Sequence, residues 1–514
     1  MSRRLLSMAR IAALIVAGAT GAGAQPGSVP GVDQTIARGE RLAAANHLDE
    51  AASLARDVLT RHPESSRAHY LLGVVHERGQ SFEAAITEYR AAIARAPKLA
   101  EAHDRLGFVL GLVGRTDDAI AEFEQAIAIR PTFFDALYHL GATLWWTKQI
   151  EPARAALGRA VALRPTHAEA RYYLGVAERQ QGDLTAAIRD LRVALRHAPM
   201  LAAAHTQLGV ALQASGDLDG AVAEFRRAVD LDPTLSDAGN SLGLALMQRG
   251  DADQAIEALR AVIARYPDHA AARLNLGTAL MQKGDLAGAT AEYRELTRRD
   301  PANAEGFYDL GLALKQQDDF DEAERALRTA MDADTTLPEA PYTLGVVLWQ
   351  TGRADEAATL FEKALARRPQ YADAHYMLGT VYRQQGNLDR AVSEFRETIR
   401  INPSSAEAHT SLGQALQATR DPEGSAAAFA EADRLTKRKA DAQAAVFAVN
   451  AGLEQLKADN VSRAIAQFRE AVRLDPDNAQ AHFQLALALR RRGALAESRK
   501  ELQAARRLRV PIRS

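Results

Sequence analysis

Apolar residues along this chain recur at steps of three and four, as in Leu378, Val381 and Tyr382. Such steps place side chains on one face of an α-helix. Gly386-Asn387 follows this stretch, where glycine can end one helix and asparagine can cap the next. The same signal occurs at Gly182-Asp183, Gly216-Asp217, Gly250-Asp251 and Gly284-Asp285. The pattern predicts a succession of short amphipathic helices joined by tight turns.

The helical pattern repeats with one fixed period. Glycine recurs every 34 residues, at positions 39, 73, 107, 141, 175, 209, 243, 277, 311, 345, 379 and 413. Alanine stands twelve positions after each glycine, except at Ser425, and proline stands 24 positions after, except at Thr335 and Lys437. After Lys437 the phase slips by five residues and resumes at Gly452. This pattern gives fourteen repeats between Val32 and Ile512.

The combination of Leu-Gly, a following alanine and aromatic residue, and a closing proline resembles the tetratricopeptide repeat. The resemblance implies an all-α fold, a right-handed α-solenoid superhelix of stacked antiparallel helix pairs. Gly379 and Ala391 would let two helices approach closely, and Phe395 would fill the space beyond. Pro403 would end the pair, because proline cannot continue a helix.

The slip in phase predicts one local change in the array. No turn signal occurs between Gly424 and Gly452, so we expect one lengthened helix there that changes the superhelical path; the alternative is an insertion without a role. The predicted organisation is a signal peptide (1–24), a linker (25–31), repeats 1–12 (32–439), an insertion within the lengthened helix (440–444), repeats 13–14 (445–512) and a tail (513–514).

The N-terminus predicts export. Arg3, Arg4 and Arg10 precede a short apolar stretch that closes on Ala22-Gly23-Ala24, a pattern that a signal peptidase accepts. We therefore expect a periplasmic or secreted protein with no transmembrane segment in the mature chain. The alternative is an uncleaved anchor. The sequence leaves open whether export takes the general or the twin-arginine route.

Composition narrows the chemistry that the chain can perform. The formal net charge of -2 gives no electrostatic reason to expect nucleic acid as a partner. There is no cysteine, and no metalloprotease, phosphate-loop or nucleophile-elbow motif is present. Six histidines share one repeat position, which predicts packing residues at the start of the first helix: His69, His103, His205, His375, His409 and His482. We expect no catalytic residues, no metal site and no cofactor.

Aromatic residues suggest where a partner would bind. Tyrosine often stands three residues before the repeat glycine, and it shares a helical stripe with residues four and seven further on. In tetratricopeptide arrays this stripe lines the concave groove, so the resemblance implies two aromatic and amide-rich concentrations there. The candidate residues are Tyr138, Trp145, Trp146, Tyr172, Arg179, Gln180, Tyr308, Lys315, Gln316, Tyr342, Trp349, Gln350, Tyr376, Arg383 and Gln384. The alternative is that these tyrosines pack against neighbouring repeats.

The sequence thus predicts a non-enzymatic scaffold of the cell envelope that binds a protein or peptide segment in its groove. Two other hypotheses stay open at this point. One is a carbohydrate-binding scaffold in envelope polysaccharide export or assembly, in which tyrosine and tryptophan stack on sugar rings. The other is an accessory subunit of an enzyme complex. The basic C-terminal segment from Arg490 to Ser514 would be a solvated capping helix or would contact an anionic surface.

Overall fold

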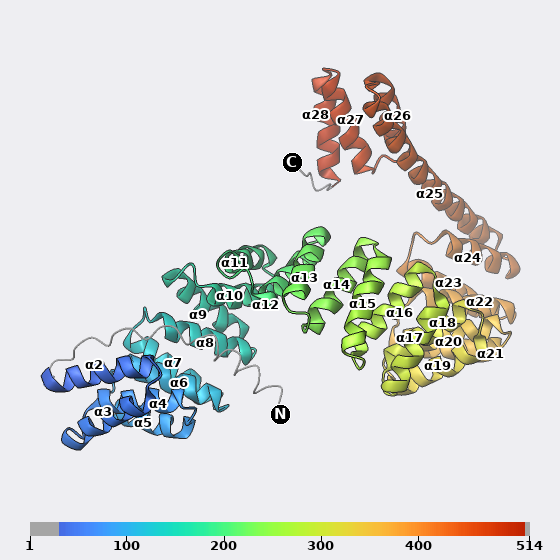
Figure 1. Cartoon of the computed structure of the whole chain (residues 1–514). Coiled ribbons are helices and arrows are strands. Elements are labelled where there is room, and N and C mark those ends of the chain that lie inside the picture. The colour runs from blue at the N-terminus through green and yellow to red at the C-terminus, as the bar shows by residue number, and fades with distance from the viewer. Residues whose placement is uncertain (1–29, 509–514) are drawn as a thin grey trace. The chain divides into compact units, whose positions relative to one another are not determined.

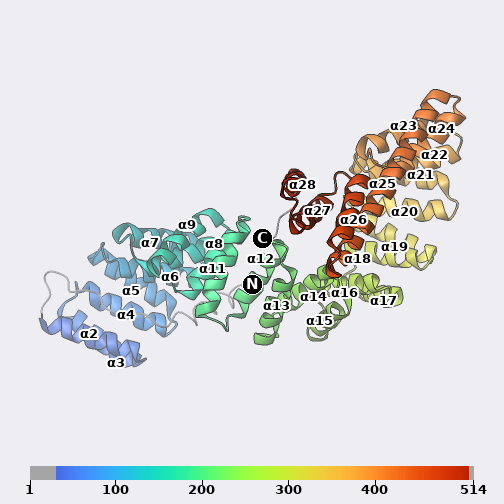
Figure 2. The same cartoon turned by 90° about the horizontal axis from the view of Figure 1, so that it is seen from above.

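The computed structural model describes residues 30–508, and every regular element in this range is a helix (Figures 1 and 2). The predicted signal peptide lies outside the described residues. The described helices are α2 (Pro30–Ala44), α3 (Leu48–Arg61), α4 (Ser66–Arg78), α5 (Phe82–Arg95), α6 (Ala100–Leu112), α7 (Thr116–Ile129), α8 (Phe134–Trp146), α9 (Ile150–Leu163), α10 (Ala168–Gln180), α11 (Leu184–His197), α12 (Ala202–Ala214), α13 (Leu218–Leu231), α14 (Ser236–Arg249), α15 (Ala252–Arg265), α16 (Ala270–Lys283), α17 (Leu286–Arg299), α18 (Ala304–Gln316), α19 (Phe320–Ala333), α20 (Glu339–Gln350), α21 (Ala354–Arg367), α22 (Ala372–Gln384), α23 (Leu388–Ile401), α24 (Ala406–Ala418), α25 (Pro422–Lys457), α26 (Val461–Leu474), α27 (Ala479–Arg491) and α28 (Leu495–Arg507).

These helices form the stacked helix pairs that the period predicts. Even-numbered helices from α2 to α24 are the first helices (helices A) of repeats 1–12, and each is followed by a second helix (helix B). The chain divides into two compact units, residues 1–283 and 284–514. We call them unit 1, whose described helices are α2–α16, and unit 2, with α17–α28. The all-α solenoid is confirmed.

Close approach of the two helices in a pair explains the periodic glycine. A Cβ atom at Gly379 would lie 2.9 Å from Cε1 of Phe395, and one at Gly73 would lie 2.5 Å from Cε1 of Tyr89. Both rings are completely buried. Because protein interiors are close-packed, neither ring has room to move away from an added side chain. The glycine and the aromatic residue sixteen positions later are therefore one packing unit.

The turns between paired helices follow the predicted chemistry only in part. Gly182 and Gly386 have positive φ angles of +83° and +78°, which glycine adopts without strain. Asp183 then accepts a hydrogen bond from the backbone N–H of Ala186, as a helix cap should. The predicted side-chain caps are wrong at two turns, one of them the turn at Gly386. The carboxylate of Asp251 instead accepts a hydrogen bond from Arg249, and the Asn387 side chain makes no capping hydrogen bond.

The periodic histidines do more than the predicted packing. In His103, Nδ1 lies 2.6 Å from a Glu122 carboxylate oxygen on the paired helix, and Nε2 lies 3.2 Å from the Pro97 carbonyl oxygen. The same 19-residue pairing occurs in His69–Glu88, His205–Glu224, His375–Glu394 and His482–Glu501. In repeat 5 Arg171 and Asp190 occupy these positions and form an ion pair. In these six repeats the histidine position therefore joins helix A to helix B by a polar contact, whereas His409 has Ala428 at the partner position.

This pairing predicts a pH-dependent contribution to stability. The hydrogen bond to the Glu122 carboxylate raises the pKa of His103 above its ordinary value, although burial opposes it. A raised folded pKa contributes stability that is complete below about pH 6.5 and is lost as the pH rises through the folded value. We expect Glu122→Gln to lower the unfolding free energy by about 1–2 kcal/mol at pH 6 and by less at pH 8.5, measured by urea titration. An equal loss at both pH values would contradict the ion pair.

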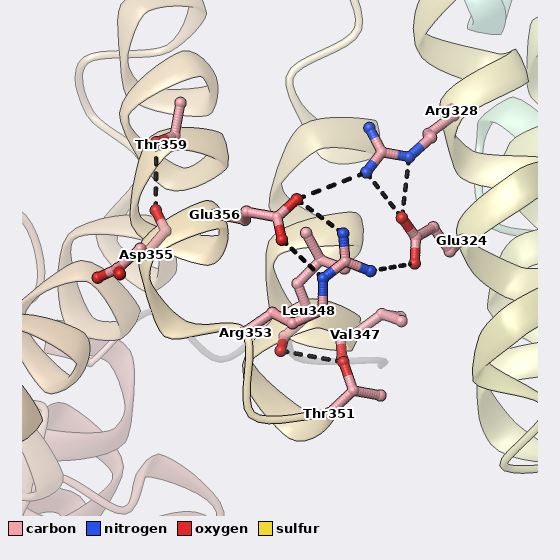
Figure 3. Close-up of polar contacts among 9 residues, drawn as sticks. All are labelled: Glu324, Arg328, Val347, Leu348, Thr351, Arg353, Asp355, Glu356 and Thr359. Carbon is pink, nitrogen blue, oxygen red and sulfur yellow. Dashed lines mark hydrogen bonds and ion pairs between the residues drawn. The ribbon is translucent and has the colours of Figure 1, made fainter.

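Ionic contacts also join helices B of neighbouring repeats. Figure 3 shows the carboxylates of Glu324 and Glu356 alternating with the guanidinium groups of Arg328 and Arg353. Arg353, the N-cap of α21, lies 2.7 Å from each carboxylate, and Arg328 lies 2.7 Å from Glu324. All four side chains are partly exposed. Since solvent screens such contacts, they align neighbouring repeats and add little stability.

One helix departs from the repeat architecture. α25 runs for 36 residues, from Pro422 to Lys457, without a break, so helix B of repeat 12 and helix A of repeat 13 form one helix. Lys437 stands where eleven other repeats have proline. With no proline to stop it, the helix continues through the five extra residues, 440–444. Figure 1 shows α25 as a long helix beyond α24.

Candidate functional site: a ladder of side chains across helices A

The predicted stripe lies where helices A of neighbouring repeats meet. We use "A-helix face" for the surface formed by residues three before, two before, one after, four after and five after each repeat glycine. Across this face, side chains 35 residues apart form hydrogen bonds between consecutive helices A. They are Asp104–His139, Asn240–Asn275 and Tyr376–Ser411 near the middle of the helices, and Trp145–Gln180, Gln213–Gln248 and Trp349–Gln384 near their ends. The face is thus a ladder of polar contacts between repeats.

Two of these contacts fix the orientation of a glutamine. The indole Nε1–H of Trp145 donates to Gln180 Oε1 at 3.1 Å, and that of Trp349 donates to Gln384 Oε1 at 3.2 Å. An indole N–H is a donor only, so the glutamine must present its oxygen to it. The amide NH2 group of each glutamine then points away from the tryptophan, and both glutamine side chains are exposed. Each pair therefore presents an oriented hydrogen-bond donor.

A guanidinium group stands beside each oriented amide. In unit 1, Arg179 Nε donates to Gln207 Oε1 at 3.2 Å. In unit 2, Arg383 donates to Gln414 Oε1. Each contact uses one of the five guanidinium N–H donors, so further donors remain on both arginines. Arginine and glutamine together make a surface suited to hydrogen-bond acceptors.

The prediction that Tyr138 of unit 1 lines the groove is wrong. Tyr138 is 4% exposed, and its ring stacks on Phe134 and contacts His167 and Tyr173. Burial raises the pKa of its hydroxyl well above the ordinary value. Tyr138 is a core residue because the next repeat places aromatic side chains over it. The alternative reading of the tyrosines as packing residues holds at this position.

The other candidates of unit 1 lie on its A-helix face. Trp145 is partly buried, and its ring centroid lies 6.4 Å from that of Trp146, which is 37% exposed. Tyr172 is also partly buried and makes an edge contact with the Tyr173 ring. Trp146 and Gln180 are therefore the exposed side chains of this cluster, and Arg179 is partly buried.

The candidates of unit 2 form the corresponding cluster on helices α18, α20 and α22. Its aromatic members, all partly buried, are Tyr308, Tyr342, Trp349 and Tyr376. The Tyr342 ring centroid lies 4.8 Å from that of Tyr371, a residue outside the predicted stripe. Lys315 is partly buried, and burial lowers the pKa of its ammonium group. The exposed amides are Gln316, Gln350 and Gln384.

The two clusters repeat one arrangement. Trp349, Arg383 and Gln384 stand six repeats after Trp145, Arg179 and Gln180. The same shift relates Tyr342 to Tyr138, while Tyr371 replaces His167. Each unit therefore carries one tryptophan–glutamine pair with an adjacent arginine. The comparison concerns the arrangement of these residues inside each unit.

Sequence reasoning missed Asp309, which lies beside Tyr308 on the A-helix face. Its carboxyl group is partly buried, and no hydrogen bond or ion pair to it occurs within residues 30–508. Burial, together with the nearby Glu305 charge, raises the pKa of Asp309 to about 7. The position two before the repeat glycine could have directed attention to it, because this position faces the preceding helix A in the 35-residue pairs.

The raised pKa of Asp309 has a consequence for stability. The carboxyl group ionises near pH 4 in the unfolded chain but near pH 7 in the folded chain, so ionisation destabilises the fold as the pH rises between these values. We expect Asp309→Asn to raise the unfolding free energy by roughly 1 kcal/mol or more at pH 8 and to change it little at pH 4. Urea titrations at both pH values measure this, with the exposed Asp332→Asn as control. Equal effects of Asp309→Asn at the two pH values would contradict a buried, unpaired carboxyl group.

Comparison with known families agrees with the repeat geometry. Models described as tetratricopeptide repeat match residues 36–100, 113–177, 202–235 and 449–509. The chain belongs to the tetratricopeptide repeat family. A further model, described as the cilia and flagella-associated protein 70 C-terminal domain, matches the tetratricopeptide repeats in residues 235–448. Arrays of this family generally bind protein or peptide partners and are typically non-enzymatic.

Solved structures with similar repeats cover part of this tetratricopeptide array. A crystal structure of MamA is 30% identical, covers 32% of this chain and 96% of that chain, and has a TM-score of 0.31. PilF of Pseudomonas aeruginosa is 24% identical, with 39% and 91% covered and a TM-score of 0.36. A tetratricopeptide protein of Thermus thermophilus is 26% identical, with 34% and 96% covered and a TM-score of 0.30. No curated protein matches the sequence.

The structure also bears on membrane crossing by the array. Within residues 30–508, no helix is both long enough and apolar enough to span a bilayer.

Proposed function

We propose that this tetratricopeptide protein is a non-enzymatic scaffold of the cell envelope that captures segments of a protein partner on two equivalent A-helix faces. The observation that carries the proposal is the duplicated tryptophan–glutamine pair, one in each unit. Preorganised donors lower the entropic cost of binding, since their orientation is fixed before the partner arrives. The envelope setting is supported by the predicted signal peptide.

The exposed groups indicate which chemistry of partner fits. Gln180 and Gln384 would each donate to a main-chain carbonyl of an extended segment, and Arg179 and Arg383 would pair with a carboxylate beside it. Trp146 and Tyr342 supply aromatic surface for an apolar side chain. The proposed ligand is thus an extended peptide segment with an acidic residue close to an apolar one. Two such segments in one partner would bind with avidity.

Site-specific photo-crosslinking in living cells tests this proposal. A photoreactive residue at Gln350 would report on the A-helix face, and one at Thr359 on α21 would report on helix B of the same repeat. Both side chains are exposed. We expect one discrete protein adduct from position 350 and none from position 359. Adducts from position 359 alone, or from both positions equally, would contradict capture on the A-helix face.

The envelope setting has its own test. N-terminal sequencing of the mature protein after cell fractionation should find Gln25 as the first residue in the periplasmic or secreted fraction. A cytosolic chain that retains Met1 would contradict the setting and would leave the A-helix face to be tested separately.

A further inference from the structure

The long helix α25 carries an exposed stripe with the spacing of a coiled coil. Six residues on it follow alternating steps of three and four, apart from a central gap: Ala426, Ala430, Ala440, Ala444, Phe447 and Ala451. Asp433 and Lys437 fill the gap and keep the same spacing. All are exposed except Ala444, which is partly buried, and Phe447 is 66% exposed. A seam repeating every 3.5 residues is the pattern by which two helices pair along their length.

Near the start of α25, two positions that are buried in repeat 11 are more exposed in repeat 12. The position of Ala430 is exposed in both repeats, since its equivalent Arg396 is also exposed. Phe395 is completely buried, whereas Phe429, at the same repeat position, is partly exposed. Val392 is 9% exposed, whereas its equivalent Ala426 is exposed. The difference arises because α25 continues straight past repeat 12, so that repeat 13 does not fold back onto it; α25 packs on α24, α26 and α27.

Repeat 13 could not cover Phe447 by stacking on repeat 12 in the way that the other repeats stack on one another. Phe447 lies five residues before its repeat glycine, a position that is alanine in repeats 2–8, 10–12 and 14. In repeat 9 this position is Gly306, where an added Cβ would lie 2.8 Å from Cδ2 of Leu296 in the preceding helix B. The usual stack therefore has no room for phenylalanine here. Phe447 needs a different partner.

The charges of α25 specify the direction in which a second α25 would pair. Residues 422–433 contain three acidic residues and no basic one, whereas residues 434–439 contain four basic residues and no acidic one. Two parallel copies would align like charges, but two antiparallel copies can place Glu431 and Asp433 of one copy against Lys439 and Lys437 of the other. With the seam in register, Asp433 of one copy faces Lys437 of the other, twice by symmetry.

We propose that α25 pairs with α25 of a second copy of this chain as an antiparallel two-helix coiled coil. The small alanines allow the helices to approach closely, and Phe447 of each copy packs against the start of the other α25. The reciprocal Asp433–Lys437 pairs set the register. The interface uses residues other than those of the A-helix faces. The proposed dimer can therefore be tested independently of the proposed partner binding.

Sedimentation velocity on the full mature chain, over a hundredfold range of concentration, tests this proposal. We expect a concentration-dependent dimer for the unmodified chain. Phe447→Glu should be monomeric throughout with an unchanged helical circular dichroism spectrum. The control Met200→Glu, at a 69% exposed apolar residue between α11 and α12 of unit 1, should dimerise normally. A monomeric unmodified chain, or a dimeric Phe447→Glu variant, would overturn the proposal.

Charge reversal and cross-linking test the direction of pairing. Asp433→Lys and Lys437→Asp should each weaken the dimer at least tenfold, and the double variant should restore it. The chain has no cysteine, so a thiol-reactive cross-linker would react only with the introduced cysteines. A short bismaleimide should link two copies of the Ala430→Cys/Ala440→Cys variant and should not link the Ala440→Cys variant. Linking of Ala440→Cys alone, or no rescue by the double charge reversal, would overturn antiparallel pairing.

Discussion

Replacing Phe395 by alanine should lower the unfolding free energy by about 3–4 kcal/mol, measured by urea titration of the circular dichroism signal. The ring is completely buried and fills the space that Gly379 leaves, so its loss opens a cavity between α22 and α23. In a repeat array each pair contacts only its neighbours, and hydrogen exchange should therefore accelerate first in these two helices. Met200→Ala, at a 69% exposed side chain, should change the free energy by less than about 0.5 kcal/mol. Equal effects of the two substitutions would contradict the packing unit of glycine and aromatic ring.

Replacing Trp349 by alanine should weaken the binding of the partner found by crosslinking by about thirtyfold or more, without lowering the melting temperature. Truncating an aromatic hot spot costs about 2 kcal/mol or more in binding free energy. Trp349→Phe separates the two contributions of the side chain. It keeps an aromatic ring but removes the N–H that orients Gln384, and it should cost about tenfold in affinity.

Isothermal titration calorimetry and thermal melting of the same samples measure both effects. Trp145→Ala in unit 1 should weaken binding similarly if the partner contacts both units, because the same tryptophan–glutamine pair occurs there. A fall in melting temperature with unchanged affinity would mean that the tryptophans only hold neighbouring repeats together.

The helix pairs were predictable because each repeat restates the same local contacts. The spacing of Gly379 and Phe395 encodes a packing contact within a single pair, and it recurs along the chain. The caps were less predictable, since a capping side chain can take a nearer partner. Asp251 did so: its carboxylate accepts from Arg249, two residues away, and leaves the helix start uncapped.

The candidate site was predictable in position but not in burial. The stripe of helix A identified the correct face, but whether a tyrosine on it is exposed depends on the residue that the next repeat places over it. His167 and Tyr173 cover Tyr138, and the period contains no information about them. Pairwise spacings carried further information. A separation of 19 residues links histidine to glutamate, and one of 35 links tryptophan to glutamine, once the fold shows which helices are adjacent.

Capture on the A-helix faces is tested most directly by hydrogen–deuterium exchange of the full mature chain with and without its crosslinked partner. The account predicts slower exchange in α8 and α10 of unit 1 and in α20 and α22 of unit 2, with helices α9, α11, α21 and α23 unchanged. Slower exchange confined to the helices B, or none in the four helices A, would contradict it.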